Sequence, residues 1–210
     1  MQRPVDGAAG ITAAIAIPLR SFVLGKARLA EVLTETERIA LARTMADRVA
    51  NAARPFPTVV ITSAPEVRTW AAARELALVD DPGSLDDAAI AGRDWARGLG
   101  APRVAIVHAD LPRIISLDAV VGDAGRAVAV IVPDHRNDGT PVLSVPTAGD
   151  FTFAYGPGSA ARHEREARAR GFDVRIVHDE QLGFDVDVPA DLERYAPADL
   201  GHWAPADRGR

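Results

Sequence analysis

The stretch RVAIVHADLP, Arg103–Pro112, decides the fold class of this chain. It opens with an apolar, β-branched run of the kind found in strands that are covered on both faces of a sheet. The run ends in Ala109-Asp110-Leu111-Pro112, so a carboxylate follows the strand directly. Open α/β sheets bind their ligands at the carboxyl ends of strands, which makes Asp110 a candidate site residue. An aspartate before Leu-Pro also commonly caps a turn or helix, and this reading stays open.

Similar apolar runs recur along the chain and alternate with helical patterns. We expect strands at 11–18, 58–63, 78–79, 103–108, 127–132, 141–145 and 174–177, and helices at 35–53, 65–76, 85–97, 118–121 and 160–170. The alternation predicts an α/β fold: a single-domain, Rossmann-like, mostly parallel sheet with helices on both faces. Residues 1–195 form the expected domain. Residues 196–210 are expected to be a poorly packed tail held by Trp203.

Composition narrows the class of protein. The chain has 210 residues, 48% of them hydrophobic and 25% charged, which fits one globular domain and excludes wholesale disorder. The absence of cysteine excludes disulfides and thiolate chemistry and suits a cytoplasmic protein. A net charge of −5 argues against a nucleic-acid partner, and no apolar run reaches the roughly 18 residues of a membrane span. Nothing in the composition indicates an oligomeric state.

Two further carboxylates stand in the segment Leu182–Val188, LGFDVDV. If this segment is extended, Asp185 and Asp187 point to one face about 7 Å apart. Two carboxylates on one face repel unless a cation lies between them, and Mg²⁺ prefers such oxygen ligands. Together with Asp110 they favour a metal site. The alternative is that Asp187 caps a helix starting at Pro189 while Asp185 is solvated.

Two glycine-containing turns could bind anions. Gly156-Pro157-Gly158-Ser159 leads into a helix, and free amides at a helix start attract anions. The alternative is a plain helix start with Ser159 as the N-cap. Asn137-Asp138-Gly139-Thr140 is a turn by default, and a backbone anion site if it lies beside the Gly156 loop.

Lys26 is the only lysine in the sequence, against 23 arginines. The presence of a single lysine in so arginine-rich a chain could be due to chance. The functional reading is that position 26 needs a compact ammonium as a point charge on phosphate.

In their order and spacing these segments resemble the guanylyltransferases that make the lactyl or enolpyruvyl guanosine-diphosphate intermediate of coenzyme F-420 biosynthesis. The resemblance runs from about Ile15 to Leu192. It rests on six segments: Gly25-Lys26-Ala27-Arg28-Leu29-Ala30, Leu85-Asp86-Asp87-Ala88, Ala109-Asp110-Leu111-Pro112, Asp138-Gly139-Thr140, Gly156 to His163, and Asp185-Val186-Asp187 with Pro189-Ala190-Asp191-Leu192.

The resemblance implies a nucleotidyltransferase fold, GTP as donor and Mg²⁺ as cofactor. It implies phosphoenolpyruvate as acceptor in the actinobacterial branch, and 2-phospho-L-lactate or 3-phosphoglycerate elsewhere. The small phosphorylated acid would be bound by Thr140, Gly156 and Ser159. The metal would be held by Asp110, Asp185 and Asp187, and Lys26 would face the GTP phosphates.

Two positions depart from the family pattern. Arg20 stands where the family usually has lysine, which keeps the charge but changes its geometry. Asp86 stands where the family usually has asparagine. If Asp86 reads the base, it would accept hydrogen bonds from guanine but repel phosphate, so guanine specificity is less firmly indicated than the transfer chemistry.

Two other classes remain open. A glycosyltransferase also uses an Asp-x-Asp for metal, but normally after a mid-chain strand. A non-catalytic nucleotide-binding protein would bind GTP without turnover. The sequence contains no Walker loop and no Gly-x-Gly-x-x-Gly, so a simple P-loop or dinucleotide site lacks support.

Overall fold

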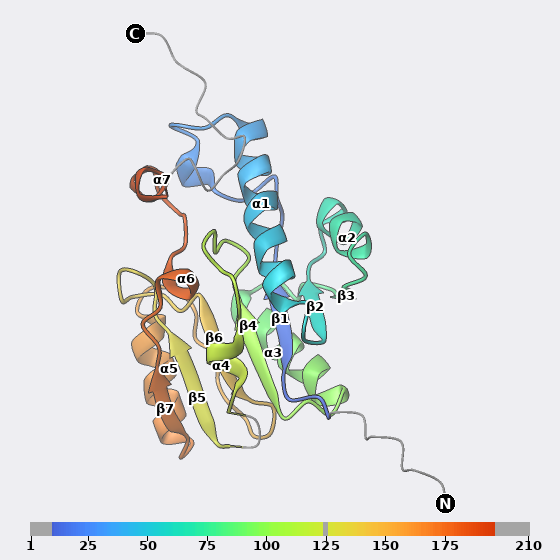
Figure 1. Ribbon diagram of the computed structural model, residues 1–210, viewed down its shortest axis with the longest axis vertical. Coiled ribbons are helices and arrows are strands. Elements are labelled where there is room, and N and C mark those ends of the chain that lie inside the picture. Colours follow the sequence, from blue (N-terminus) through green and yellow to red (C-terminus); the bar gives the residue numbers. More distant parts are fainter. Residues whose placement is uncertain (1–9, 124–125, 196–210) are drawn as a thin grey trace, which may run out of the picture.

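The computed structural model describes residues 10–123 and 126–195, which form a seven-stranded sheet with helices on both faces (Figure 1). The strand order is β3-β2-β1-β4-β6-β5-β7. The strands are β1 (Ala14–Pro18), β2 (Thr58–Ile61), β3 (Ala77–Val79), β4 (Arg103–Val107), β5 (Val128–Val132), β6 (Val142–Pro146) and β7 (Asp173–Ile176). The predicted tail, including Trp203, lies outside the described residues.

The sheet is parallel except for β6, which runs antiparallel to both of its neighbours, β4 and β5. The predicted fold class is therefore confirmed, with one strand reversed. The reversal matters for the site, because the start of an antiparallel strand lies at the same edge as the ends of the parallel ones. Thr140, just before β6, thus reaches the edge where Asp110 follows β4.

Helices cover the two faces unequally. They are α1 (Glu35–Ala53), α2 (Pro65–Ala72), α3 (Leu85–Gly98), α4 (Asp118–Val121), α5 (Ser159–Ala169), α6 (Glu180–Gly183) and α7 (Pro189–Arg194), with a 3-10 turn η1 (Ala27–Leu29). One apolar cluster contains residues of α1, α2 and α4, and a second contains residues of α3 and α5. Successive residues of β1 alternate between the two clusters, as a strand buried on both faces requires.

A capping box forms the start of α1. The Thr34 side chain accepts a hydrogen bond from the Glu37 amide, and the Glu37 carboxylate accepts one from the Thr34 amide. The helix ends at Ala53, just before Pro55.

Helix α3 packs unusually close to the sheet at Gly92. A Cβ at this position would lie 2.5 Å from the Cβ of Ala16 in β1. Only glycine permits this approach, and it brings the start of α3 beside the end of β1.

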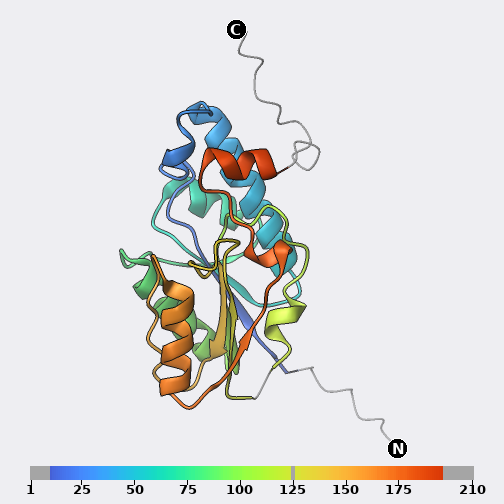
Figure 2. The ribbon, with the colours of Figure 1, turned by 90° about the vertical axis from the view of Figure 1, so that its left-hand side faces the viewer.

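A third apolar cluster lies beyond the carboxyl edge of the sheet and joins distant parts of the sequence. Figure 2 shows η1, the start of α1 and α7 side by side there. The members are Leu29, Leu33, Leu41, Met45, Phe184, Val186, Leu192 and Tyr195. This cluster fixes the segment that carries Asp185 and Asp187.

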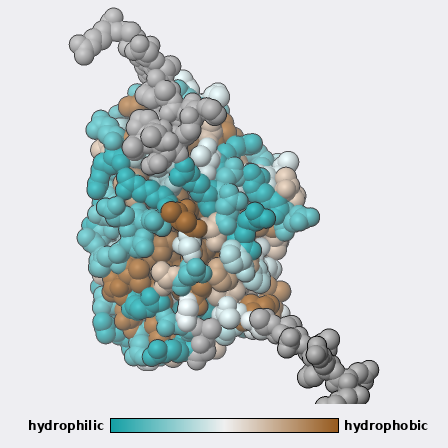
Figure 3. Space-filling view, in the orientation of Figure 1, coloured by the Kyte–Doolittle hydropathy of each residue, from teal (hydrophilic) through white to brown (hydrophobic). Residues whose placement is uncertain are grey.

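The visible surface is mostly hydrophilic, with hydrophobic residues gathered toward the β5–β7 end of the sheet (Figure 3). The four-residue α4 covers little of that end, and Ile176 of β7 is exposed. Within 10–123 and 126–195, no helix has the length and apolarity needed to cross a membrane.

Candidate active site

Three adjoining cavities follow the carboxyl edge of the sheet. The main cavity, of about 440 Å³, is lined by Asp110, Asp185, Asp187, Thr140, Gly156 and Ser159 among others. The Lys26 cavity, of about 270 Å³, includes Arg20, Lys26 and Asp110, and the β2-side cavity, of about 290 Å³, includes Arg20 and Asp81. Leu85 lines all three, so they form one continuous row.

Asp110 and Asp187 are held together by Lys26. The Lys26 Nζ donates to Asp110 Oδ2 at 2.6 Å and to Asp187 Oδ1 at 2.9 Å. Burial works to lower the pKa of the Lys26 ammonium, but the charges of the two aspartates outweigh it and raise that pKa. Lys26 therefore stays protonated and partly neutralises the acidic cavity.

The backbone at Lys26 is in the left-handed region, with φ 57°, where η1 begins. This conformation is uncommon for a residue with a side chain and costs free energy unless its surroundings fix it. Here the two carboxylates fix the side chain, which is only 9% exposed.

Asp185 lies deeper in the main cavity than Asp187. Burial and the charges of Asp110, Asp187 and Asp134 raise the pKa of Asp185 to about 7. Its Oδ1 lies 3.3 Å from His135 Nδ1, yet neither atom has a hydrogen-bond partner.

The segment around Asp185 is not a strand, although Phe184 and Val188 are extended. Phe184 and Val186 are buried in the third apolar cluster, while the aspartates line the cavity. The alternative that Asp187 caps the following helix is wrong. Asp191 accepts hydrogen bonds from the amides of Asp187 and Val188, and Asp187 binds Lys26 instead.

The donor set suits a divalent cation but is not preassembled around one. Among residues 10–123 and 126–195, no group of three or more His, Asp or Glu side chains is arranged to hold a metal ion. However, Asp110 Oδ1 and Asp185 Oδ1 are buried without hydrogen-bond partners in the cavity. Unpartnered carboxylate oxygens are what Mg²⁺ binds, so these residues fit it, and the three-aspartate metal site stays a prediction.

Opposite the aspartates, Thr140 and Ser159 form a buried hydroxyl pair. Their Oγ atoms lie 3.0 Å apart, and Thr140 Oγ1 lies 3.1 Å from His163 Nδ1. Ser159 is not the N-cap of α5, so that alternative is wrong. Gly158, at φ 73°, holds the N-cap position and leaves the Ser159 hydroxyl to face Thr140.

The two glycine-containing turns lie side by side, as the anion-site interpretation requires. Asp138 Oδ1 accepts from the Gly158 amide, and the Asp138 carbonyl accepts from the Ala160 amide. These bonds join the β5–β6 connection to the start of α5, so Thr140, Gly156 and Ser159 line the same cavity.

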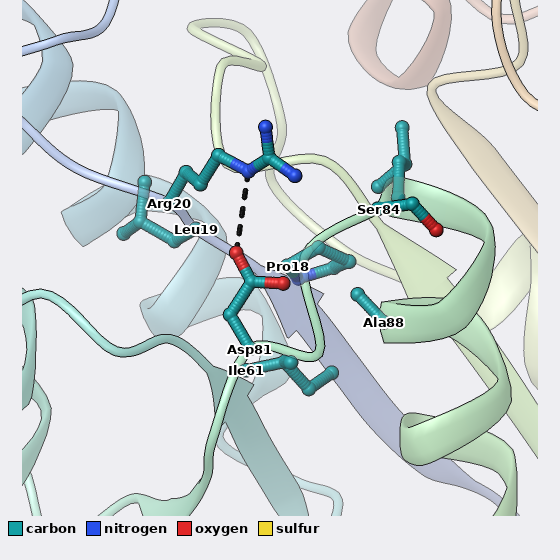
Figure 4. Close-up of a pocket in the computed structure, with 8 residues that line it drawn as sticks. Pro18, Leu19, Arg20, Ile61, Asp81, Ser84 and Ala88 are labelled. Atoms are coloured by element: carbon teal, nitrogen blue, oxygen red, sulfur yellow. Dashed lines mark hydrogen bonds and ion pairs between the residues drawn. The ribbon is translucent and has the colours of Figure 1, made fainter.

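Arg20 lies at the far end of the row. In Figure 4 it reaches over the β2-side cavity to Asp81, with Nε 3.2 Å from Asp81 Oδ2. It also donates to the carbonyl of Gly83. Pro18, Ile61 and Ala88, at the ends of β1 and β2 and in α3, supply apolar walls.

Asp86 contacts the loop that precedes α5. Its Oδ1 accepts a 2.7 Å hydrogen bond from the Tyr155 amide, so in this structure it joins α3 to the loop before α5. Asp86 is not among the residues that line the three cavities. Its predicted contact with the base stays a prediction.

A model of the family described as guanylyl transferase, CofC like, matches residues 13–195. The chain belongs to this family. The match includes every residue predicted for the site and so bears out the resemblance drawn from the sequence.

The chain is also similar to individual guanylyltransferases. It is 36% identical over 193 residues to a phosphoenolpyruvate guanylyltransferase of Sphaerobacter thermophilus, covering 89% of this chain and 93% of that one. It is 37% identical over 175 residues to a 2-phospho-L-lactate guanylyltransferase of Halorubrum lacusprofundi, covering 80% and 76%. A nucleotidyl transferase of Methanothermobacter thermautotrophicus shares the fold, with a TM-score of 0.63, 13% identity, and coverage of 90% and 97%.

Sequence reasoning missed several residues that line this candidate site. His108, Tyr155 and Arg136 line the main cavity, and Arg136 also binds Asp191 at 2.6 Å. His108 Nε2 and Tyr155 Oη are buried without hydrogen-bond partners. His108 stands two residues before Asp110, directly after β4. Its position at the carboxyl end of a buried strand is the feature of the sequence that could have identified it as a cavity residue.

Proposed function

We propose that this chain is a guanylyltransferase that joins GMP from GTP to phosphoenolpyruvate, giving enolpyruvyl-diphospho-guanosine and pyrophosphate in coenzyme F-420 biosynthesis. The observation that carries the proposal is the row of three cavities: an arginine-rimmed one, the Lys26 cavity next to it, and the main cavity, which three aspartates and two hydroxyls line. The family membership supports the guanylyl transfer.

The β2-side cavity suits the nucleoside. Its apolar walls would cover the faces of a flat purine, and its polar rim, Arg20 and Asp81, offers hydrogen bonds to the edge or the ribose. The triphosphate would then run through the Lys26 cavity, where a lysine and an arginine supply positive charge. The row as a whole is of the size that buries small ligands, roughly 300–1,000 Å³.

The main cavity suits the phosphorylated acid. Thr140 and Ser159 supply hydroxyls, and Gly156 lines the cavity beside them. Arg28 and Arg136 also line this cavity and attract an anion.

Transfer requires an acceptor phosphate oxygen to attack the α-phosphorus of GTP while pyrophosphate leaves. The attacking phosphate is already anionic, so the residues need not remove a proton. The obstacle is repulsion between two polyanions, and positioning with charge neutralisation supplies most of the rate. Asp110, Asp185 and Asp187 would hold Mg²⁺, which when bound supplies Lewis-acid charge stabilisation between the two phosphates.

Lys26 has two tasks in this scheme. In the structure it neutralises Asp110 and Asp187. Because Lys26 also lines the adjoining cavity proposed for the triphosphate, its ammonium would supply positive charge there, as cations do in other phosphoryl transfers.

The test is pyrophosphate release by Asp187→Asn with GTP and phosphoenolpyruvate, compared with wild type over a range of Mg²⁺. Loss of one electrostatic group at the reacting centre is expected to slow turnover about 100-fold or more. Near-normal turnover at saturating Mg²⁺ would refute the role of Asp187. A glycosyltransferase would instead consume a GDP-sugar, and a binding protein would retain GTP without turnover.

The acceptor is assayed in parallel with phosphoenolpyruvate, 2-phospho-L-lactate and 3-phosphoglycerate, and the donor with GTP, ATP and CTP. The similarity to a phosphoenolpyruvate enzyme favours the first acceptor. We place the reaction in the cytoplasm, which fits a chain without cysteine.

A further inference from the structure

His163 of α5 lies behind the Thr140–Ser159 pair rather than in the main cavity. It is fully buried, and its ring meets Tyr155 edge-on at 4.8 Å between centroids. Both ring nitrogens have partners. Nε2 accepts a 3.0 Å hydrogen bond from the Ala154 amide, and Nδ1 lies 3.1 Å from Thr140 Oγ1.

The Ala154 amide fixes which nitrogen carries the proton. A backbone N–H can only donate, so Nε2 must be the unprotonated nitrogen of a neutral ring. The proton is therefore on Nδ1, which donates to Thr140 Oγ1. With the other tautomer, two N–H groups would face each other across 3.0 Å.

The direction of the hydrogen bond from His163 to Thr140 also sets the direction of the bond between Thr140 and Ser159. Because Thr140 Oγ1 accepts a hydrogen bond from Nδ1–H, the Thr140 hydroxyl can direct its own proton to Ser159 Oγ, its neighbour at 3.0 Å. The Ser159 proton is then left over and faces the cavity that both residues line. If Nδ1 were an acceptor, Thr140 would donate to it and Ser159 to Thr140. No hydroxyl proton would remain for an anion.

We propose that His163 is a positioning residue that orients the Thr140–Ser159 pair so that Ser159 presents its hydroxyl proton to an anionic oxygen of the acceptor. The proposal deepens the function given above and rests on it for the identity of the acceptor. Burial and the positive charge of Arg162 support the required neutral ring, because they lower the pKa of His163 to about 4.

The first test uses the wild-type protein and does not depend on activity. Nitrogen-15 NMR of the histidine side chains distinguishes the two neutral tautomers, and the His163 signal is assigned by its loss in His163→Phe. We expect the Nδ1–H form at neutral pH. The Nε2–H form, or an imidazolium, would overturn the proposal whether or not the enzyme turns over phosphoenolpyruvate.

The second test is a double-mutant cycle on the acceptor KM. His163→Asn can still place an amide N–H toward Thr140, so its KM should stay within about threefold of wild type. His163→Phe keeps the ring packing but no longer donates a hydrogen bond to Thr140, so the direction of the Thr140–Ser159 bond is not fixed. This variant should raise the acceptor KM about three- to tenfold. The KM for GTP should not change.

The cycle separates positioning from packing. In a Ser159→Ala background no Ser159 proton remains to be oriented, so His163→Phe should add nothing to the acceptor KM. An equal rise in both backgrounds, or a parallel rise in the KM for GTP, would assign His163 a purely structural role. His178→Gln, at an exposed histidine outside the cavity row, is the matched control. Absence of wild-type turnover would count against the proposed function and leave the tautomer result to decide this inference.

Discussion

Replacing Lys26 by methionine removes the ammonium that neutralises two of the predicted metal ligands. Methionine is also unbranched, so it keeps much of the side-chain bulk and the same left-handed backbone requirement. Breaking a buried ion pair costs about 3–5 kcal/mol, because a charge stays buried without its partner. Asp187 is 41% exposed and partly screened by water, whereas Asp110 is 24% exposed. We therefore expect the lower end, about 3 kcal/mol.

For a chain of this length, a loss of 3 kcal/mol corresponds to a fall in Tm of about 6–12 °C. Thermal unfolding is measured in EDTA and then in Mg²⁺. Because Mg²⁺ can replace the missing positive charge, it should raise the Tm of Lys26→Met more than that of wild type. Adding Asp110→Asn to Lys26→Met removes the unpaired buried carboxylate and should restore part of the lost stability.

The matched control is Arg68→Met, which breaks an ion pair of the same 2.6 Å length on the surface. Surface pairs contribute only about 0–1 kcal/mol, so this variant should melt within about 4 °C of wild type. If Lys26→Met melts no lower than the control in EDTA, or if Mg²⁺ stabilises both proteins equally, the account of Lys26 as the neutralising cation fails.

Three further changes test other parts of the structure. Asp86→Asn keeps a side-chain oxygen that can accept the hydrogen bond from the Tyr155 amide, so the KM for the phosphorylated acid should stay near that of wild type. Asp86→Ala loses this bond and should raise that KM several-fold in steady-state kinetics. Gly92→Ala should cost about 1–3 kcal/mol in denaturant unfolding, since its Cβ has no room against β1, and an unchanged midpoint would contradict the close packing. Burial, Arg162 and His108 lower the pKa of His163 from 6.5 to about 4, so its contribution to stability is present above pH 6.5 and is lost as the pH falls toward 4. Over that interval His163→Phe should lose less stability than wild type, and parallel pH profiles would exclude this linkage.

The strands and the long helices were predictable because their signals are local. The apolar runs and the Thr34 capping box act within a few residues, and the structure places elements at the predicted positions. Asp110 was found because a carboxylate directly after a buried strand can point only to the sheet edge or to a local cap.

What sequence reasoning missed depends on long-range pairing. The run 141–145 has the composition of any buried strand, so its antiparallel direction was not visible. Nor was the pairing of Lys26 with carboxylates 84 and 161 residues away. The base-facing role expected for Asp86 was inferred from resemblance, whereas its contact with Tyr155 depends on a loop from the far end of the chain.

The last strand ends at Ile176, so residues 180–195 contribute nothing to the sheet. Yet this short stretch delivers two of the three acidic side chains, together with the apolar residues that anchor them to η1 and α1. The sheet and two of the three predicted metal ligands are thus encoded in separate parts of the polypeptide. Substitutions after residue 180 can therefore change the acidic lining of the cavity without touching a strand of the sheet.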